Sequence, residues 1–95
     1  MFYDHKYGVE LEKIFGKIGR DPKLIHEFLY DILSPAEYKE LAVRWQIVKQ
    51  LKAGIPQRDI AKDLKISVAT VTRGSREMMN KKGGFAEVLK KYYSK

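Results

Sequence analysis

The chain has 95 residues, and its 19 lysines and arginines outnumber its 12 acidic residues to give a net charge of +7. Hydrophobic residues make up 44% of it and aromatic residues 12%, which excludes a disordered chain and fits one globular domain over residues 1–95. Because cysteine is absent, disulfides, cysteine-based zinc sites and thiolate catalysis are excluded. His5 and His26 form no metal-ligand pattern, so we expect no metal cofactor.

The positive charge is concentrated in one part of the chain. Residues 1–34 carry 5 basic and 6 acidic side chains, a net charge of −1, whereas residues 55–82 carry 7 basic and 3 acidic side chains, a net charge of +4. Such a segment attracts a polyanion such as DNA. The alternative interpretation is a solvated surface without a partner.

No targeting or membrane segment is apparent. No apolar run approaches the roughly 18 residues that a membrane-spanning helix needs. The first residues lack the basic region and apolar run of a signal peptide. We therefore expect a cytoplasmic protein without a membrane partner.

Apolar residues recur with helical spacing along the chain, and no strand-like alternation of any length is present. Apolar stripes run through four segments: 11–18, 24–33, 41–51 and 85–92. Together with the segment between residues 51 and 85, these stripes predict an all-α fold of about six short helices.

Local signals mark the ends of these helices. Asp21-Pro22 predicts a helix start with an acidic N-cap and proline in the first turn. Ser34 and Glu37 have the spacing of a capping box, and Gly54 predicts the end of the helix that they start. Pro56 favours another start, but no side chain before it can serve as a cap.

Residues 56–76 read as a helix–turn–helix, the unit that places one short helix in the major groove of DNA. Small Ala61 lies where the two helices must approach closely, Ile66 fills the space between them and Val71 points inward. Ser67 is a good N-cap for the second helix. The alternative is an ordinary pair of packed helices, and Lys65 stands at the turn position that glycine most often occupies.

Several predicted helices have apolar faces wider than one neighbour can cover in a chain of 95 residues. This favours a homodimer, because a second copy would cover the remaining apolar surface. Two-fold pairing would also place two reading helices about one DNA turn apart, as a palindromic operator requires. A compact monomer with a few exposed apolar residues is the alternative.

Taken together, several segments resemble the tryptophan operon repressor family. The resemblance covers about half of the chain and rests on Leu33–Glu37, Leu41–Arg44, Gly54–Ile60 and, most specifically, Ala69–Ser75. It implies an intertwined, all-helical homodimer that represses transcription by binding double-stranded DNA, with L-tryptophan as corepressor.

The resemblance also implies a ligand site. In the family two arginines bracket the indole ring, and the matching residues are Arg44 and Arg73; a flat guanidinium can stack on an aromatic ring and also pair with a carboxylate. Backbone carbonyls that take the ligand's ammonium group map to Leu33 and Ser34.

Three further residues complete this predicted site. Gly74 would leave room beside the ligand and Thr70 would line its floor. Glu77 departs from the family, which usually has a small polar residue there. At i, i+4 it can pair with Arg73, compete with the ligand's carboxylate and fill the pocket internally. A regulator of the same fold that does not respond to tryptophan is therefore the alternative function.

The predicted DNA contacts fall into three groups. Val68, Ala69 and Thr72 would face base edges, where small apolar side chains suit thymine methyl groups. Gln57, Arg58 and Thr70 would touch phosphates or bases. Sequence-independent attraction would come from Lys62, Lys65 and Arg76.

An enzyme or an RNA-directed factor is the competing class. The sequence shows no nucleophile–base pair, no clustered carboxylates and no phosphate-binding glycine loop in a recognisable context. We therefore expect a binding protein without catalytic activity.

Overall fold

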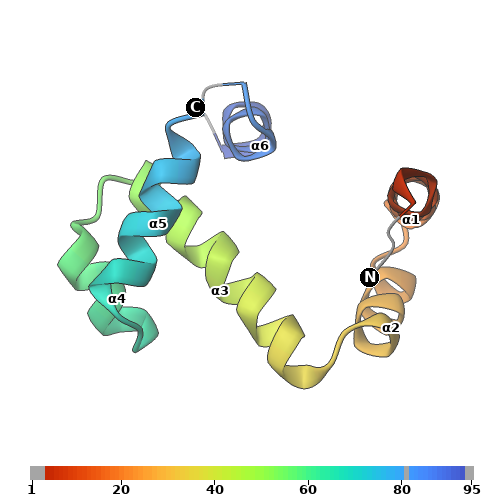
Figure 1. Cartoon of the computed structure of the whole chain (residues 1–95), viewed down its shortest axis with the longest axis horizontal. Coiled ribbons are helices and arrows are strands. Elements are labelled where there is room, and N and C mark those ends of the chain that lie inside the picture. The colour runs from red at the N-terminus through yellow and green to blue at the C-terminus, as the bar shows by residue number, and fades with distance from the viewer. Residues whose placement is uncertain (1–3, 81, 94–95) are drawn as a thin grey trace. The chain divides into compact units, whose positions relative to one another are not determined.

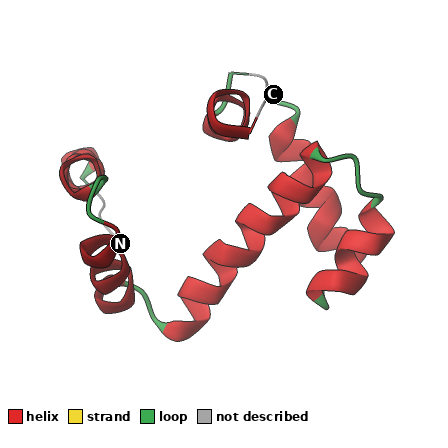
Figure 2. Ribbon diagram, turned by 180° about the vertical axis from the view of Figure 1, so that it is seen from behind, coloured by secondary structure: helices red, strands yellow, loops and turns green. Residues whose placement is uncertain are grey.

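The computed structural model describes residues 4–80 and 82–93, and in this part of the chain all regular structure is α-helical (Figures 1 and 2). The helices are α1 (His5–Ile18), α2 (Pro22–Ile32), α3 (Pro35–Lys52), α4 (Gln57–Leu64), α5 (Val68–Met78) and α6 (Gly84–Tyr93). The predicted all-α fold of about six helices is confirmed. None of the helices within the described ranges is long and apolar enough to cross a membrane.

Hydrogen bonds at Asp21 and Ser34 confirm the helix starts predicted there. Asp21 Oδ1 accepts a hydrogen bond from the Leu24 amide at 3.1 Å. At the start of α3 the Ser34 amide donates to Glu37 Oε1 at 2.8 Å, and the Glu37 amide donates to Ser34 Oγ at 3.2 Å. Hydrogen bonds with Ser34 lower the pKa of Glu37 below its ordinary value. The bond from the Ser34 backbone has the larger effect on this pKa, and the bond with the Ser34 side chain has the smaller one.

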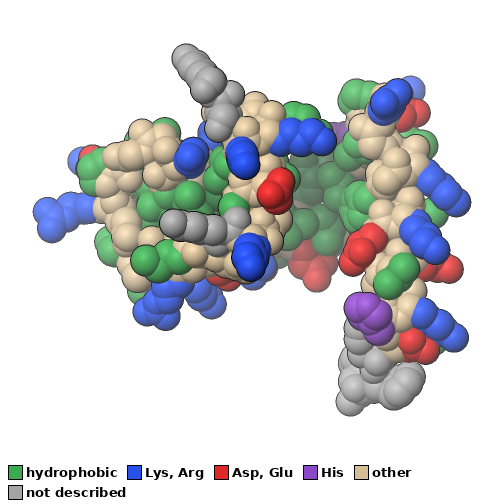
Figure 3. Space-filling model, turned by 90° about the horizontal axis from the view of Figure 1, so that it is seen from above, with side chains coloured by type: hydrophobic (Ala, Val, Ile, Leu, Met, Phe, Trp, Pro, Cys, Tyr) green, Lys and Arg blue, Asp and Glu red, His purple; other side chains and the backbone are tan. Residues whose placement is uncertain are grey.

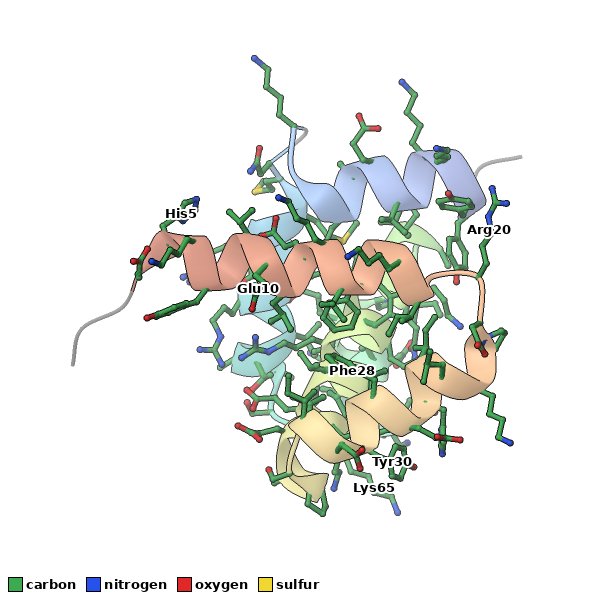
Figure 4. All side chains as sticks on the ribbon, turned by 90° about the vertical axis from the view of Figure 1, so that its right-hand side faces the viewer. His5, Glu10, Arg20, Phe28, Tyr30 and Lys65 are labelled. Atoms are coloured by element: carbon green, nitrogen blue, oxygen red, sulfur yellow. The ribbon has the colours of Figure 1, made fainter. Side chains whose placement is uncertain are left out.

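The chain contains two compact units, Met1–Tyr38 and Lys39–Lys95. In the first unit α1 and α2 meet through Phe15 and Phe28, whose rings pack edge to face with centroids 5.4 Å apart. Figure 4 shows Phe28 between the two helices. Both helices are amphipathic, yet none of their described residues is buried. This unit therefore has contacts but no interior of its own.

The second unit has a small apolar core where α3, α4 and α5 meet. Ile47, Ile60, Ala61 and Val71 form it, and each is at most 5% exposed. The inward positions predicted for Ala61 and Val71 are thus confirmed. On another side of α3, Trp45 packs against α6, with its ring 5.5 Å from that of Tyr93.

The turn between α4 and α5 is left-handed at Lys65, as its sequence position predicts. Lys65 has φ 57° and ψ 47°, and the Ile66 amide donates to the Ala61 carbonyl at 3.0 Å. This hydrogen bond closes the turn and directs the chain into α5. A side chain in this conformation is strained by contact between its Cβ and the backbone.

Lys65→Gly should therefore raise the free energy of unfolding by about 1 kcal/mol, because glycine relieves this strain. Urea unfolding followed by circular dichroism measures the change. Lys65→Ala is the matched control, since alanine also removes the charge and the long side chain but keeps the Cβ. Equal stability of the two variants would contradict a strained turn.

Candidate functional site

Helices α4 and α5 and the turn between them form a helix–turn–helix (Figure 1). Ser67 caps α5: its Oγ accepts from the Thr70 amide at 3.1 Å and lies 2.8 Å from Thr70 Oγ1. No side chain caps α4 at Pro56, as the sequence predicts. The first turn of α5 is therefore held by its own cap and by the closed turn before it.

The outer side of α5 presents small side chains to solvent. Val68 is 48% exposed, and Ala69 is exposed as well. Thr72, which the sequence places on the same side, is only partly exposed. Its Oγ1 donates to Gln57 Oε1 at 2.8 Å and lies 3.0 Å from the Val68 carbonyl. The structure thus joins two predicted DNA-contact residues, Gln57 and Thr72, across α4 and α5.

The basic residues of this region are available to a partner. Arg58, Lys62, Lys65 and Arg76 are exposed, and the salt bridges of the described residues involve none of them. Figure 3 shows lysine and arginine side chains at the edges of the second unit, whereas on α1 basic and acidic side chains alternate. This difference agrees with the charge distribution in the sequence.

A pocket lies between α3, α5 and α6. It has a cavity volume of about 90 Å³ within an open hollow of about 460 Å³. The pocket is lined by Arg44, Ile47, Val48, Thr70, Arg73, Gly74, Glu77 and Phe85. The structure therefore brings together five predicted ligand residues: Arg44, Thr70, Arg73, Gly74 and Glu77.

Leu33 and Ser34, whose carbonyls are predicted to accept hydrogen bonds from the ligand's ammonium group, are not among the residues that line this pocket. Leu33 and Ser34 line a separate hollow of the first unit, together with Tyr30, Pro35 and Tyr38. That hollow has a cavity volume of about 180 Å³ and an aromatic wall, because the Tyr30 and Tyr38 rings are 4.8 Å apart.

The charged groups of the pocket differ in their partners. Arg44 is bound by Glu40, one turn earlier on α3, with 2.7 Å between Nη2 and Oε1. The possible ion pair between Arg73 and Glu77 is not formed, although both side chains line the pocket. The pair that forms has the acidic residue before the basic one, the more favourable order at i, i+4.

Sequence reasoning missed four residues of the site. Glu40 could have been found from its i, i+4 spacing to Arg44. Ile47 and Val48 carry no signal beyond their place in an apolar stripe, and Phe85 joins the pocket only because α6 folds back onto α3 and α5. No three described His, Cys, Asp or Glu side chains come together as a metal site.

Gly74 sets the distance between α3 and α5. A Cβ built on Gly74 would lie 2.6 Å from Ile47 Cγ2, far inside van der Waals contact. Ile47 is 2% exposed, and its Cγ2 methyl is attached directly to Cβ, so it cannot move aside without the helix. The pocket wall therefore depends on glycine at this position.

Gly74→Ala should force α3 and α5 apart and reduce the free energy of unfolding by about 1–3 kcal/mol, as overpacking does in other cores. Urea unfolding measures the loss. Ile47→Leu provides the control background, because leucine keeps the volume but has no Cγ2 methyl. If Gly74→Ala cost the same in both backgrounds, the contact with Ile47 would not be its cause.

The comparisons with known proteins agree on one family. The family model described as "Trp repressor protein" matches residues 11–93. A Trp operon repressor homolog of Haemophilus influenzae (strain PittEE) is 35% identical over 77 residues, which cover 80% of this chain and 76% of that protein. The homolog of Chlamydia trachomatis serovar L2 (strain ATCC VR-902B / DSM 19102 / 434/Bu) is 37% identical over 70 residues, 68% of this chain and 74% of its own length.

A shorter and stronger similarity covers half of the chain. The homolog of Actinobacillus succinogenes is 48% identical over 50 residues, which are 52% of this chain and 50% of that protein. No solved structure matches the chain. The family model spans both units and all of the pocket residues, so the chain belongs to the Trp repressor family of transcriptional regulators.

Proposed function

We propose that this protein is a DNA-binding transcriptional repressor that uses L-tryptophan as corepressor. It acts as a homodimer on a palindromic operator and has no catalytic activity. As a regulator of transcription it would work in the cytoplasm, where bacterial DNA lies.

One observation carries the proposal: α5 has both a solvent face and a pocket face. Val68 and Ala69 at its start are exposed, whereas Arg73 and Gly74 line the pocket. A ligand in the pocket therefore presses on the same rigid helix that would enter the major groove. Such an arrangement couples the two binding events, and the coupling free energy acts equally in both directions.

The pocket suits an aromatic amino acid in its chemistry. Arg44 and Arg73 offer two flat cations, and Ile47, Val48 and Phe85 offer apolar surface for an indole ring. The pocket opens to solvent through a hollow of about 460 Å³, so part of a bound ligand would stay outside the enclosed cavity. Arg44 and Arg73 are both exposed, and such long side chains can rearrange around a ring.

For DNA contact we propose that Val68, Ala69 and Thr72 approach base edges while Arg58 and Arg76 approach phosphates. Gln57 and Thr70 would contribute hydrogen bonds, and Lys62 and Lys65 would add general attraction. Of the three residues proposed to approach base edges, Val68 and Ala69 offer only methyl groups. Specificity would then depend on water-mediated contacts and DNA shape.

The proposal of a homodimer is supported by α1 and α2. They comprise 14 and 11 residues, and no described residue in them is buried. Large apolar side chains such as Leu11, Leu24 and Ile32 are 39–49% exposed. A second copy would cover these faces, and we propose that the two units then form one domain over residues 1–95.

A second candidate function is a repressor that does not respond to tryptophan. Glu77 favours it, because a carboxylate in the pocket repels the ligand's own carboxylate. The internal Arg73–Glu77 pair that would fill the pocket is not formed, so we prefer the tryptophan-responsive function.

Tryptophan should raise the affinity of the protein for its operator at fixed salt. The operator can be found by selecting bound duplexes from a random library with and without millimolar L-tryptophan. Titration calorimetry with L-tryptophan alone, and then with the selected duplex present, should show the same factor of tightening in both directions.

Two outcomes would contradict parts of this proposal. Identical affinities with and without tryptophan would exclude the corepressor while leaving DNA binding intact. Selected sequences with only one half-site would exclude the symmetric dimer, because two-fold pairing predicts half-sites about one helical turn apart.

Arg58→Ala should weaken DNA binding and lower the slope of log affinity against log salt concentration by about 1, since one phosphate contact would be lost. Fluorescence anisotropy with labelled duplex at several salt concentrations measures the slope. Lys91→Ala on α6 removes the same charge outside the helix–turn–helix and serves as the control. An unchanged slope in Arg58→Ala would remove this residue from the interface.

A further inference from the structure

Glu77 has no structural role that accounts for its position. It lies in the last turn of α5, where the helix dipole disfavours an acidic side chain. It follows Arg73 by one turn in the less favourable order and makes no salt bridge with it. Its side chain lines the pocket.

The two arginines of the pocket differ in whether they form a salt bridge. Arg44 forms an exposed salt bridge with Glu40 at 2.7 Å. Arg73 forms no salt bridge among the described residues. The pocket is therefore lined by two cations, Arg44 and Arg73, and one anion, Glu77, and Arg73 and Glu77 are not paired with each other.

We propose that Glu77 binds the α-ammonium group of the ligand while Arg73 binds its α-carboxylate, so that the pocket selects zwitterionic amino acids. This inference rests on the proposed function, because it takes an indole amino acid as the ligand. The two side chains lie four residues apart on one face of α5. Both are long enough to converge on the adjacent charged groups of one amino acid.

The composition of the pocket supports this assignment. Glu77 is the only anionic side chain among the residues that line the pocket as described. A carboxylate also binds an ammonium group more strongly than a neutral carbonyl does, because both partners are charged.

The assignment predicts which analogues bind. A ligand without the ammonium group, such as indole-3-propionate, would place a carboxylate near Glu77 with nothing between the two negative charges. A ligand without the carboxylate, such as tryptamine, would leave Arg73 without its partner. Loss of one charge-assisted hydrogen bond typically lowers affinity by about tenfold or more.

The test is titration calorimetry of the full-length protein with L-tryptophan, tryptamine and indole-3-propionate. The wild-type protein should prefer L-tryptophan to indole-3-propionate by about tenfold or more. Glu77→Gln, which keeps the size of the side chain but not its charge, should reduce this preference by weakening L-tryptophan and strengthening indole-3-propionate. Glu87→Gln on α6 removes an acidic side chain outside the pocket and should leave the preference unchanged.

Each other outcome overturns the inference in a distinguishable way. If L-tryptophan binds and Glu77→Gln changes both affinities equally, the inference fails while the proposed function stands. Tighter binding of L-tryptophan by Glu77→Gln would show that Glu77 obstructs the pocket, and would also overturn the inference. Binding of none of the three ligands would overturn the inference and the corepressor together, while DNA binding is measured separately.

Discussion

The close approach of α3 and α5 at Gly74 is the constraint on which the rest of the molecule depends. Ile47 occupies the space where a Cβ would stand, with 2.6 Å between that position and its Cγ2. The same isoleucine belongs to the core with Ile60 and Val71. One contact therefore fixes the spacing of the core, one wall of the pocket and the position of α5. A change of even one methyl group there would alter all three, because packed interiors leave no room to absorb it.

This constraint holds α5 as one rigid helix. In the proposed function this helix both contacts DNA and lines the ligand pocket. Ser67 caps its first turn, Lys65 sets the direction from which the chain enters it, and Gly74 lets it lie against α3. The exposed residues Val68 and Ala69 at its start are small, while the charged residues Arg73 and Glu77 line the pocket. In the proposed function, communication between ligand and DNA would need no change of fold. A small displacement of α5 by a bound ring would change its fit to the major groove.

Local features of the structure could be predicted from the sequence, and tertiary features could not. The capping box of Ser34 and Glu37, the cap at Ser67 and the left-handed Lys65 depend on neighbours within a few residues, and all are present. The pairing of Arg44 with Glu40 also has a local signal in its spacing. The presence of Phe85 in the pocket and the Gln57–Thr72 hydrogen bond depend on how separate helices pack. Helical periodicity shows which face of a helix is apolar, but not which helix covers it.

No described residue of α1 or α2 is buried, so in the proposed homodimer the stability of these helices would depend on protein concentration. Side chains such as Phe15 and Leu24 remain open to water in a lone chain, at 37% and 44% exposure. In the proposed homodimer their burial against another copy would be a mass-action event, so dilution would weaken the N-terminal helices before it affected the core around Ile47. Cells that make few copies would expose these helices to proteases, and a rising supply would protect them. In the proposed homodimer the lifetime of the protein would therefore depend on its own concentration.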